Sequence, residues 1–202
     1  MAATEHEHVI RARWESGDRR GAIDETIKRY GPEIFGLLMA LHDDEDEAAD
    51  AFSELCERLL RSIDGFGYRC SMRTWAYLLA RRASRDVRRS KRRRRAVPLS
   101  EADELGQLVA RVRTCTMTIL RTETKTALGA LRDELEPEDR MLLVLRVDRK
   151  LAWDELARVF LDEDASDQRA VVRESARLRK RFQLVKDRLR ALAAERGLLD
   201  ES

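Results

Sequence analysis

The sequence predicts an all-α protein of two small helical domains joined by a linker. Three observations favour helices. The 202 residues include only three prolines and nine glycines, and 39% of them are charged. Apolar residues recur at intervals of three and four, the spacing of a buried helix face, and no stretch sustains the alternation typical of a strand. The hydrophobic content of 43% is sufficient for real cores in a chain of this length.

The first domain is expected to span residues 1–95 and to contain four helices. The apolar periodicity predicts them over residues 5–16, 18–41, 44–63 and 71–92. Local breaks are expected at Gly17-Asp18 and at Gly31-Pro32. The loop 64–70 carries two glycines and two aromatic residues, and it either exposes these rings or folds over the helical bundle.

A linker with some helix is expected over residues 96–123, where Pro98 interrupts the preceding helix. The second domain is expected to span residues 124–202 and to contain four more helices. They are predicted over residues 124–135, 137–147, 151–160 and 167–195. Pro137 suits a first helical position, because the amide hydrogen that it lacks would have no partner there.

The helix expected over residues 71–92 combines an apolar stripe with a dense positive edge. The stripe contains Met72, Trp75, Leu79, Ala83 and Val87. Between Arg81 and Arg95 there are ten basic residues and one acidic residue, although the formal net charge of the chain is only +2. Arginines packed this closely repel one another unless an anion lies across them, and a phosphate backbone rewards contact by releasing counterions. The pattern favours nucleic-acid binding over a solvated charge run.

The second domain has the order of elements found in a helix-turn-helix. A short amphipathic helix over residues 151–160 is followed by the acidic connection 161–166 and then by a long basic helix. The long helix places basic residues on one face and an apolar stripe on another, as a helix that reads base edges requires. The apolar stripe contains Val171, Leu178, Phe182, Val185 and Leu189. The connection is longer than a tight helix-turn-helix needs and lacks glycine. By itself the pattern is also compatible with a plain helical bundle or a coiled-coil seam.

Catalysis, metal binding and membrane insertion find little support in the residue pattern. The cysteines are three in number and widely spaced, which predicts neither a disulfide framework nor a zinc site. Glu5-His6-Glu7-His8 lacks a third or fourth metal ligand at a defined spacing. The acidic run 43–47 lacks the glycine of a calcium loop. No apolar run has the length of a signal or membrane span. We therefore expect a cytoplasmic protein that is not an enzyme, with no cofactor, no metal and no membrane insertion.

Several motifs occur in an order that resembles bacterial RNA polymerase sigma factors of the extracytoplasmic-function class. They are Tyr30-Gly31-Pro32-Glu33-Ile34-Phe35, Ala48-Ala49-Asp50-Ala51-Phe52-Ser53-Glu54, Met72-Arg73-Thr74-Trp75-Ala76-Tyr77 and Leu151-Ala152-Trp153-Asp154-Glu155-Leu156-Ala157. The resemblance covers about residues 9–95 and 124–190. It implies that the first domain binds core RNA polymerase and melts the minus-ten promoter element, while the second domain binds the minus-thirty-five element as duplex. Members of this class are often held by an anti-sigma partner.

The resemblance also implies a role for individual residues. The polymerase-binding positions are Asp50, Ser53 and Glu54. The minus-ten positions are Phe66, Tyr68, Arg69, Met72, Arg73, Arg81, Arg82, Arg85, Arg88 and Arg89. The candidates for the minus-thirty-five contacts are Arg169, Arg173, Arg177, Arg179 and Lys180.

The leading interpretation is a sigma factor that gives core polymerase its promoter specificity without catalysis of its own. Three alternatives stay open. A stand-alone helix-turn-helix regulator would dimerise through the first domain and bind palindromic duplex without polymerase. A metal-dependent nuclease would use the acidic residues 43–50 beside the arginine helix. A purely structural helical protein would show no salt-dependent binding of nucleic acid.

Overall fold

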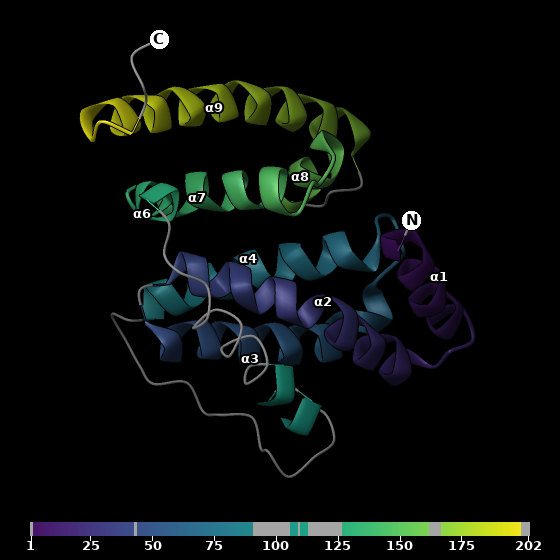
Figure 1. Cartoon of the computed structure of the whole chain (residues 1–202). Coiled ribbons are helices and arrows are strands. Elements are labelled where there is room, and N and C mark those ends of the chain that lie inside the picture. The colour runs from purple at the N-terminus through teal and green to yellow at the C-terminus, as the bar shows by residue number, and fades with distance from the viewer. Residues whose placement is uncertain are drawn as a thin grey trace. The chain divides into compact units, whose positions relative to one another are not determined.

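The computed structural model describes residues 2–42, 44–90, 106–108, 110–112, 127–161 and 167–198 (Figure 1). The chain divides into two compact units, Met1–Arg121 and Thr122–Ser202. Every secondary-structure element in the described residues is helical, which confirms the predicted all-α fold. Several predictions fall outside the described residues: those on residues 91–95 of the arginine run, on most of the linker and on the acidic connection 162–166.

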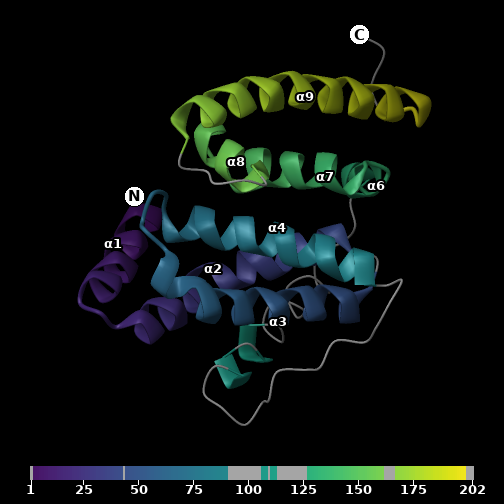
Figure 2. The same ribbon diagram turned by 180° about the vertical axis from the view of Figure 1, so that it is seen from behind.

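Up to residue 90, the described part of the first unit forms four long helices and one short 3-10 turn, and residues 106–108 and 110–112 are also helical. The elements up to residue 90 are α1 (Ala2–Glu15), α2 (Arg19–Leu41), α3 (Glu45–Ser62), η1 (Ile63–Gly65) and α4 (Met72–Ser90). Helices α2, α3 and α4 pack side by side, and α1 lies against α2 and against the beginning of α4 (Figures 1 and 2). The loop between η1 and α4 therefore comes close to α1.

Local signals account for where these helices begin. Gly17 lies in the turn between α1 and α2 and has a φ of +85°, a left-handed conformation that glycine adopts without strain. Asp18 then caps α2, because its carboxylate accepts a hydrogen bond from the Gly21 amide at 2.9 Å. Asp44 caps α3 in the same way through the Asp46 amide, also at 2.9 Å.

The break expected at Gly31-Pro32 is wrong, because both residues lie inside the continuous helix α2. Proline removes one helical hydrogen bond and usually kinks or ends a helix. Here the buried residues on either side, Ile27 and Ile34, hold the two halves of the helix against the core. The glycine instead allows a close approach: a Cβ at this position would lie 3.1 Å from Val112 Cγ1.

The core of the first unit lies between α2, α3 and α4. The rings of Phe35 and Phe52 meet there with centroids 5.4 Å apart. Tyr77 of α4 is also completely buried. Polar contacts tie the same helices together at one end, where the buried His42 ring lies 3.2 Å from Glu47 Oε2 and 2.9 Å from Ser84 Oγ.

The second unit contains the helices predicted for a helix-turn-helix domain. They are α6 (Ala127–Asp133), α7 (Pro137–Leu143), η2 (Val144–Asp148), α8 (Trp153–Phe160) and α9 (Gln168–Glu195). Pro137 stands in the first turn of α7, as predicted. The helix expected over residues 137–147 widens into a π-helical turn, η2, after Leu143.

Helix α9 runs along the core of the second unit, and the other described α-helices of this unit pack against it. Its buried residues Val171, Leu178 and Val185 belong to the predicted apolar stripe. The other two members of the stripe, Phe182 and Leu189, are half-buried and pack against the same core. Helices α6, α7 and α8 all contact α9, so the long helix presents one buried face and one exposed face.

Within the part of the chain that the structure describes, no helix is long and apolar enough to cross a membrane. The described residues also hold no group of three or more histidine, cysteine, aspartate or glutamate side chains arranged to bind a metal ion.

Candidate nucleic-acid interface

The beginning of α4 carries an aromatic cluster. Phe66 stacks on Trp75 with ring centroids 4.3 Å apart and an angle of 16° between the planes. Tyr68 lies 4.9 Å from Phe66 and 5.2 Å from Trp14 of α1. Phe66 is only 6% exposed, while Tyr68 is half-buried. The sequence allowed either a loop with exposed rings or a loop folded over the bundle. The structure shows the second arrangement, because Phe66 is covered and Tyr68 is half-buried.

A carboxylate from α1 anchors this loop. Glu7 Oε1 accepts one hydrogen bond from the Tyr68 hydroxyl at 3.1 Å and one from the Met72 amide at 2.5 Å. Glu7 Oε2 accepts a third hydrogen bond, from the Tyr30 hydroxyl of α2, at 3.3 Å. These contacts could not be predicted from local patterns, because they join residues separated by 23 to 65 positions.

The same contacts change the acidity of the two tyrosines. Burial raises the pKa of Tyr68, and the nearby negative charge of Glu7 raises it further. Burial and the same carboxylate also raise the pKa of Tyr30. Both phenols therefore keep their protons and act as hydrogen-bond donors throughout the physiological pH range.

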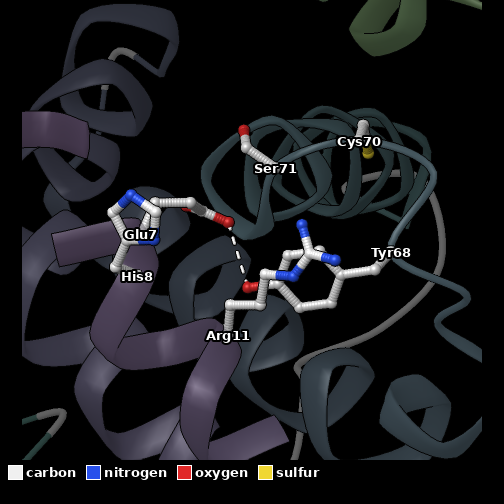
Figure 3. Close-up of a pocket in the computed structure, with 6 residues that line it drawn as sticks. All are labelled: Glu7, His8, Arg11, Tyr68, Cys70 and Ser71. Atoms are coloured by element: carbon white, nitrogen blue, oxygen red, sulfur yellow. Dashed lines mark hydrogen bonds between the residues drawn. The ribbon is translucent and has the colours of Figure 1, made fainter. Parts of the chain in front are cut away.

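A pocket of about 270 Å³ opens between α1 and the loop (Figure 3). It is lined by Glu7, His8, Arg11, Tyr68, Cys70 and Ser71. The Arg11 guanidinium lies over the Tyr68 ring, 5.3 Å from its centroid. The pocket thus offers an aromatic ring, a cation and an exposed rim beside the predicted minus-ten residues.

The predicted minus-ten residues differ widely in their exposure. Met72 is completely buried, and Phe66 and Arg81 are each only 6% exposed. Arg82, Arg85 and Arg88 are half-buried, whereas Arg69 and Arg89 are exposed. The structure thus brings Phe66, Tyr68 and Met72 together at the start of α4 and spreads the arginines along that helix.

Arg73 connects α4 to α2. Its Nε and Nη2 donate to the two carboxylate oxygens of Glu33 at 2.8 and 3.1 Å, an arrangement in which two parallel hydrogen bonds fix the geometry. Burial would by itself lower the pKa of Arg73, but the hydrogen bonds and the charge of Glu33 outweigh burial and raise it. The guanidinium also lies over the rings of Tyr30 and Tyr77, at 5.8 and 5.7 Å.

The predicted polymerase-binding residues share one face of α3. Asp50, Ser53 and Glu54 are all half-buried, at spacings of three and four along the helix. Glu54 Oε1 accepts hydrogen bonds from Arg58 at 2.7 Å and from Arg61 at 3.2 Å. Arg58 continues to Asp86 of α4 at 2.7 Å. Glu54 of α3 and Asp86, the one acid of α4, therefore belong to one ion-pair network.

In the second unit, the five predicted minus-thirty-five residues of α9 are all exposed, but they differ in their contacts and in the helix face they occupy. Arg177 donates two hydrogen bonds to Glu174, at 2.8 and 2.7 Å, and Arg179 lies 5.6 Å from the centroid of the Trp153 ring. The other three, Arg169, Arg173 and Lys180, lie on the outer face of the helix, opposite its buried stripe.

The start of α9 is fixed by two contacts. Asp167 caps the helix by accepting a hydrogen bond from the Arg169 amide at 2.9 Å. Ser175 donates to the Trp153 carbonyl of α8 at 2.9 Å, which holds the first two turns of α9 against α8. The exposed side chain of Val172, an apolar residue among these cations, is 61% accessible.

Residues 26–94 match the family model of sigma-70 region 2. The match begins within α2 and includes α3, the aromatic loop and α4, and it leaves α1 and the second unit outside. No curated protein matches the chain. The match supports a sigma-70 family sigma factor, a kind of protein that takes part in promoter recognition, and region 2 of such factors binds core RNA polymerase and promoter DNA.

Proposed function

We propose that this protein is a sigma factor of the extracytoplasmic-function class. It binds core RNA polymerase, recognises a promoter through both units and melts the minus-ten element. The observation that carries this proposal is the match of residues 26–94 to sigma-70 region 2. The match includes the two features that nucleic-acid binding needs, an aromatic cluster and a helix rich in arginine.

In this proposal α3 docks on core polymerase through Asp50, Ser53 and Glu54. The three side chains share one helix face, and two of them are carboxylates that can meet arginines of a partner. Arg58 already neutralises part of the charge of Glu54.

The loop before α4 holds an unpaired base of the melted strand. A base that leaves the duplex loses its stacking neighbours, at a cost of a few kcal/mol, and stacking on an aromatic ring offsets about 1–3 kcal/mol of this cost for each base. Tyr68 is the ring of the cluster that borders a pocket, whereas Phe66 is almost fully covered. Tyr68 and the neighbouring Arg69 are thus the better candidates for direct contact with the strand. Strand separation is driven by binding energy, and the chemistry belongs to the polymerase.

The remaining arginines of α4 bind the phosphate backbone next to the melted region. Arg89 is exposed, and Arg82, Arg85 and Arg88 are half-buried along the same helix. In the second unit the outer face of α9 binds the minus-thirty-five element as duplex. Arg169 and Arg173 stand in the first two turns of α9, the part of a recognition helix that contacts base edges. The protein acts in the cytoplasm with the polymerase, and an anti-sigma partner would regulate it.

Run-off transcription from a genomic fragment library tests the proposal. Purified core polymerase is assayed with and without the full chain, and with two double variants: Asp50→Ala with Glu54→Ala, and Arg85→Ala with Arg88→Ala. Matched controls replace the exposed Glu15 and Arg29 by alanine. We expect discrete start sites that need the protein, that both double variants lose and that both controls keep. Duplex footprints by the protein alone, without any initiation, would instead identify a stand-alone regulator.

A further inference from the structure

Helix α1 lies outside the segment that matches sigma-70 region 2, yet it supplies three of the six residues that line the loop pocket. These residues are Glu7, His8 and Arg11 (Figure 3). The predicted minus-ten residues include none of the three. The contacts of Glu7 and Arg11 give each of them a separate function at the pocket.

Glu7 caps α4 from a distance. The first amides of a helix lack partners within the helix, and a negative charge at this end is favourable. Ser71 is the local cap, and its hydroxyl accepts from the Thr74 amide at 3.0 Å. The Met72 amide, at the first position of α4, donates to Glu7 Oε1 at 2.5 Å. The carboxylate of α1 thereby completes the cap of a helix that begins 65 residues later in the chain.

Glu7 also holds the loop in an uncommon backbone conformation. Tyr68 has a φ of +50°, in the left-handed region that non-glycine residues rarely adopt. Such a conformation persists only where the surroundings impose it. The hydrogen bond from the Tyr68 hydroxyl to Glu7, together with ring contacts to Trp14 and Phe66, supplies that constraint. Among the described residues, the bond to Glu7 is the one hydrogen bond that joins the Tyr68 hydroxyl to α1, and it is lost when Glu7 is replaced by alanine.

Arg11 brings a cation to the same ring. Its guanidinium lies 5.3 Å from the centroid of Tyr68, and its side chain remains 57% exposed while it pairs with Glu15 at 2.8 Å. An ion pair this exposed contributes little, so a nucleic-acid phosphate can compete for the guanidinium. A strand that stacks a base on Tyr68 carries the phosphates of its backbone on either side of that nucleotide.

We propose that α1 forms one wall of the melted-strand site, with Glu7 as a positioning residue for Tyr68 and Arg11 as a direct contact to a strand phosphate. This inference rests on the proposed function and extends the site beyond the matched segment. Glu7 acts through the loop and does not touch DNA. Arg11 touches the backbone of the strand and is indifferent to base identity.

Hydrogen exchange tests the positioning role without any DNA. In the full chain, Glu7→Ala is compared with Glu7→Gln, which keeps an oxygen acceptor, and with Glu15→Gln as a control on the same helix. We expect the Met72 amide and the loop amides to exchange at least about tenfold faster in Glu7→Ala, with most of the protection restored in Glu7→Gln. Unchanged loop exchange in Glu7→Ala, with helical content retained, overturns this role.

Strand binding tests the Arg11 contact. The probe is a fluorescent single-stranded oligonucleotide with the minus-ten sequence obtained from run-off transcription, bound to the complex of core polymerase with the full chain. Arg29→Gln is the matched control, because Arg29 pairs with Glu25 at the same i, i+4 spacing and at 2.7 Å. For Arg11→Gln we expect the slope of log affinity against log salt to fall by about 0.7, the value for one single-strand phosphate. A slope equal to that of the control overturns the contact.

The two failures are distinguishable from failure of the proposed function. If the unaltered protein does not support strand binding by polymerase, the proposed function fails, and the hydrogen-exchange result still decides whether Glu7 orders the loop. If the unaltered protein binds the strand and Glu7→Ala binds it equally well despite faster loop exchange, Glu7 orders the loop but does not serve the site, and the inference is overturned.

Discussion

Removal of the Arg73 guanidinium is expected to act mainly on the stability of the first unit, and not through a direct contact with DNA. Arg73 stands among the predicted minus-ten residues, but its two hydrogen bonds go to Glu33 of α2. The Arg73 and Glu33 side chains retain only 18% and 22% exposure. In Arg73→Met the methionine fills most of the volume of the arginine stem and leaves the Glu33 carboxylate without this partner.

The size of the effect follows from the geometry of the pair. A hydrogen bond to a charged group contributes about 1.5–3 kcal/mol, and a fully buried ion pair that loses one partner costs about 3–5 kcal/mol. Water reaches about a fifth of each side chain here and partly replaces the lost donor. We therefore expect Arg73→Met to lower the free energy of unfolding by about 2–3 kcal/mol. Glu33→Gln together with Arg73→Met should recover part of that loss, because no charge is then left unpaired.

Urea unfolding followed by circular dichroism measures the two single variants and the double variant as a cycle. The expected coupling free energy is about 1.5–2 kcal/mol. Strictly additive losses would refute the reasoning, because they would mean that the Arg73–Glu33 contact does not stabilise the fold. DNA affinity should be compared under conditions in which every variant is folded.

Three further outcomes are expected. Phe66→Ala should lower the free energy of unfolding by about 3 kcal/mol, because it empties a site that is only 6% exposed. Tyr68→Phe should lower it by about 1 kcal/mol, because it removes one hydrogen bond. Urea unfolding measures both, and equal losses would contradict the assignment of Phe66 to the core. Lys180→Ala should lower the salt slope of duplex binding by about 0.9, measured by fluorescence anisotropy; an unchanged slope would remove Lys180 from the interface. Burial raises the pKa of the Cys56 thiol, so Cys56 should resist alkylation at pH 8 while the half-buried Cys70 reacts. Peptide mass mapping identifies the alkylated cysteine, and faster alkylation of Cys56 than of Cys70 would contradict this prediction.

The helices could be predicted from the sequence because their causes are local. Apolar spacing and the position of Pro137 are short-range signals, and the structure contains the expected helices to within a few residues at the ends described. Gly31-Pro32 misled the prediction because a buried helix face outweighs a single missing hydrogen bond. The π-helical turn at η2 has no signal of comparable strength in the sequence.

The candidate site could be predicted only in part, because its organising contacts are long-range. The sequence pointed to Phe66 and Tyr68 but not to Trp14 or Glu7, which meet them only when α1 folds back onto α4. The pairing of Arg177 with Glu174 is different. A spacing of three on a helix is a local signal, and it could have separated Arg177 from the outer-face cations of α9.

Permanganate footprinting tests the central claim most directly, because permanganate oxidises unpaired thymines. The template is a promoter fragment identified by run-off transcription, incubated with core polymerase, with this protein, with both or with neither, and without nucleoside triphosphates. We expect reactive thymines in the minus-ten region only when both core polymerase and this protein are present. A footprint in which the protein protects duplex DNA and no thymine becomes reactive, with or without polymerase, would contradict this expectation.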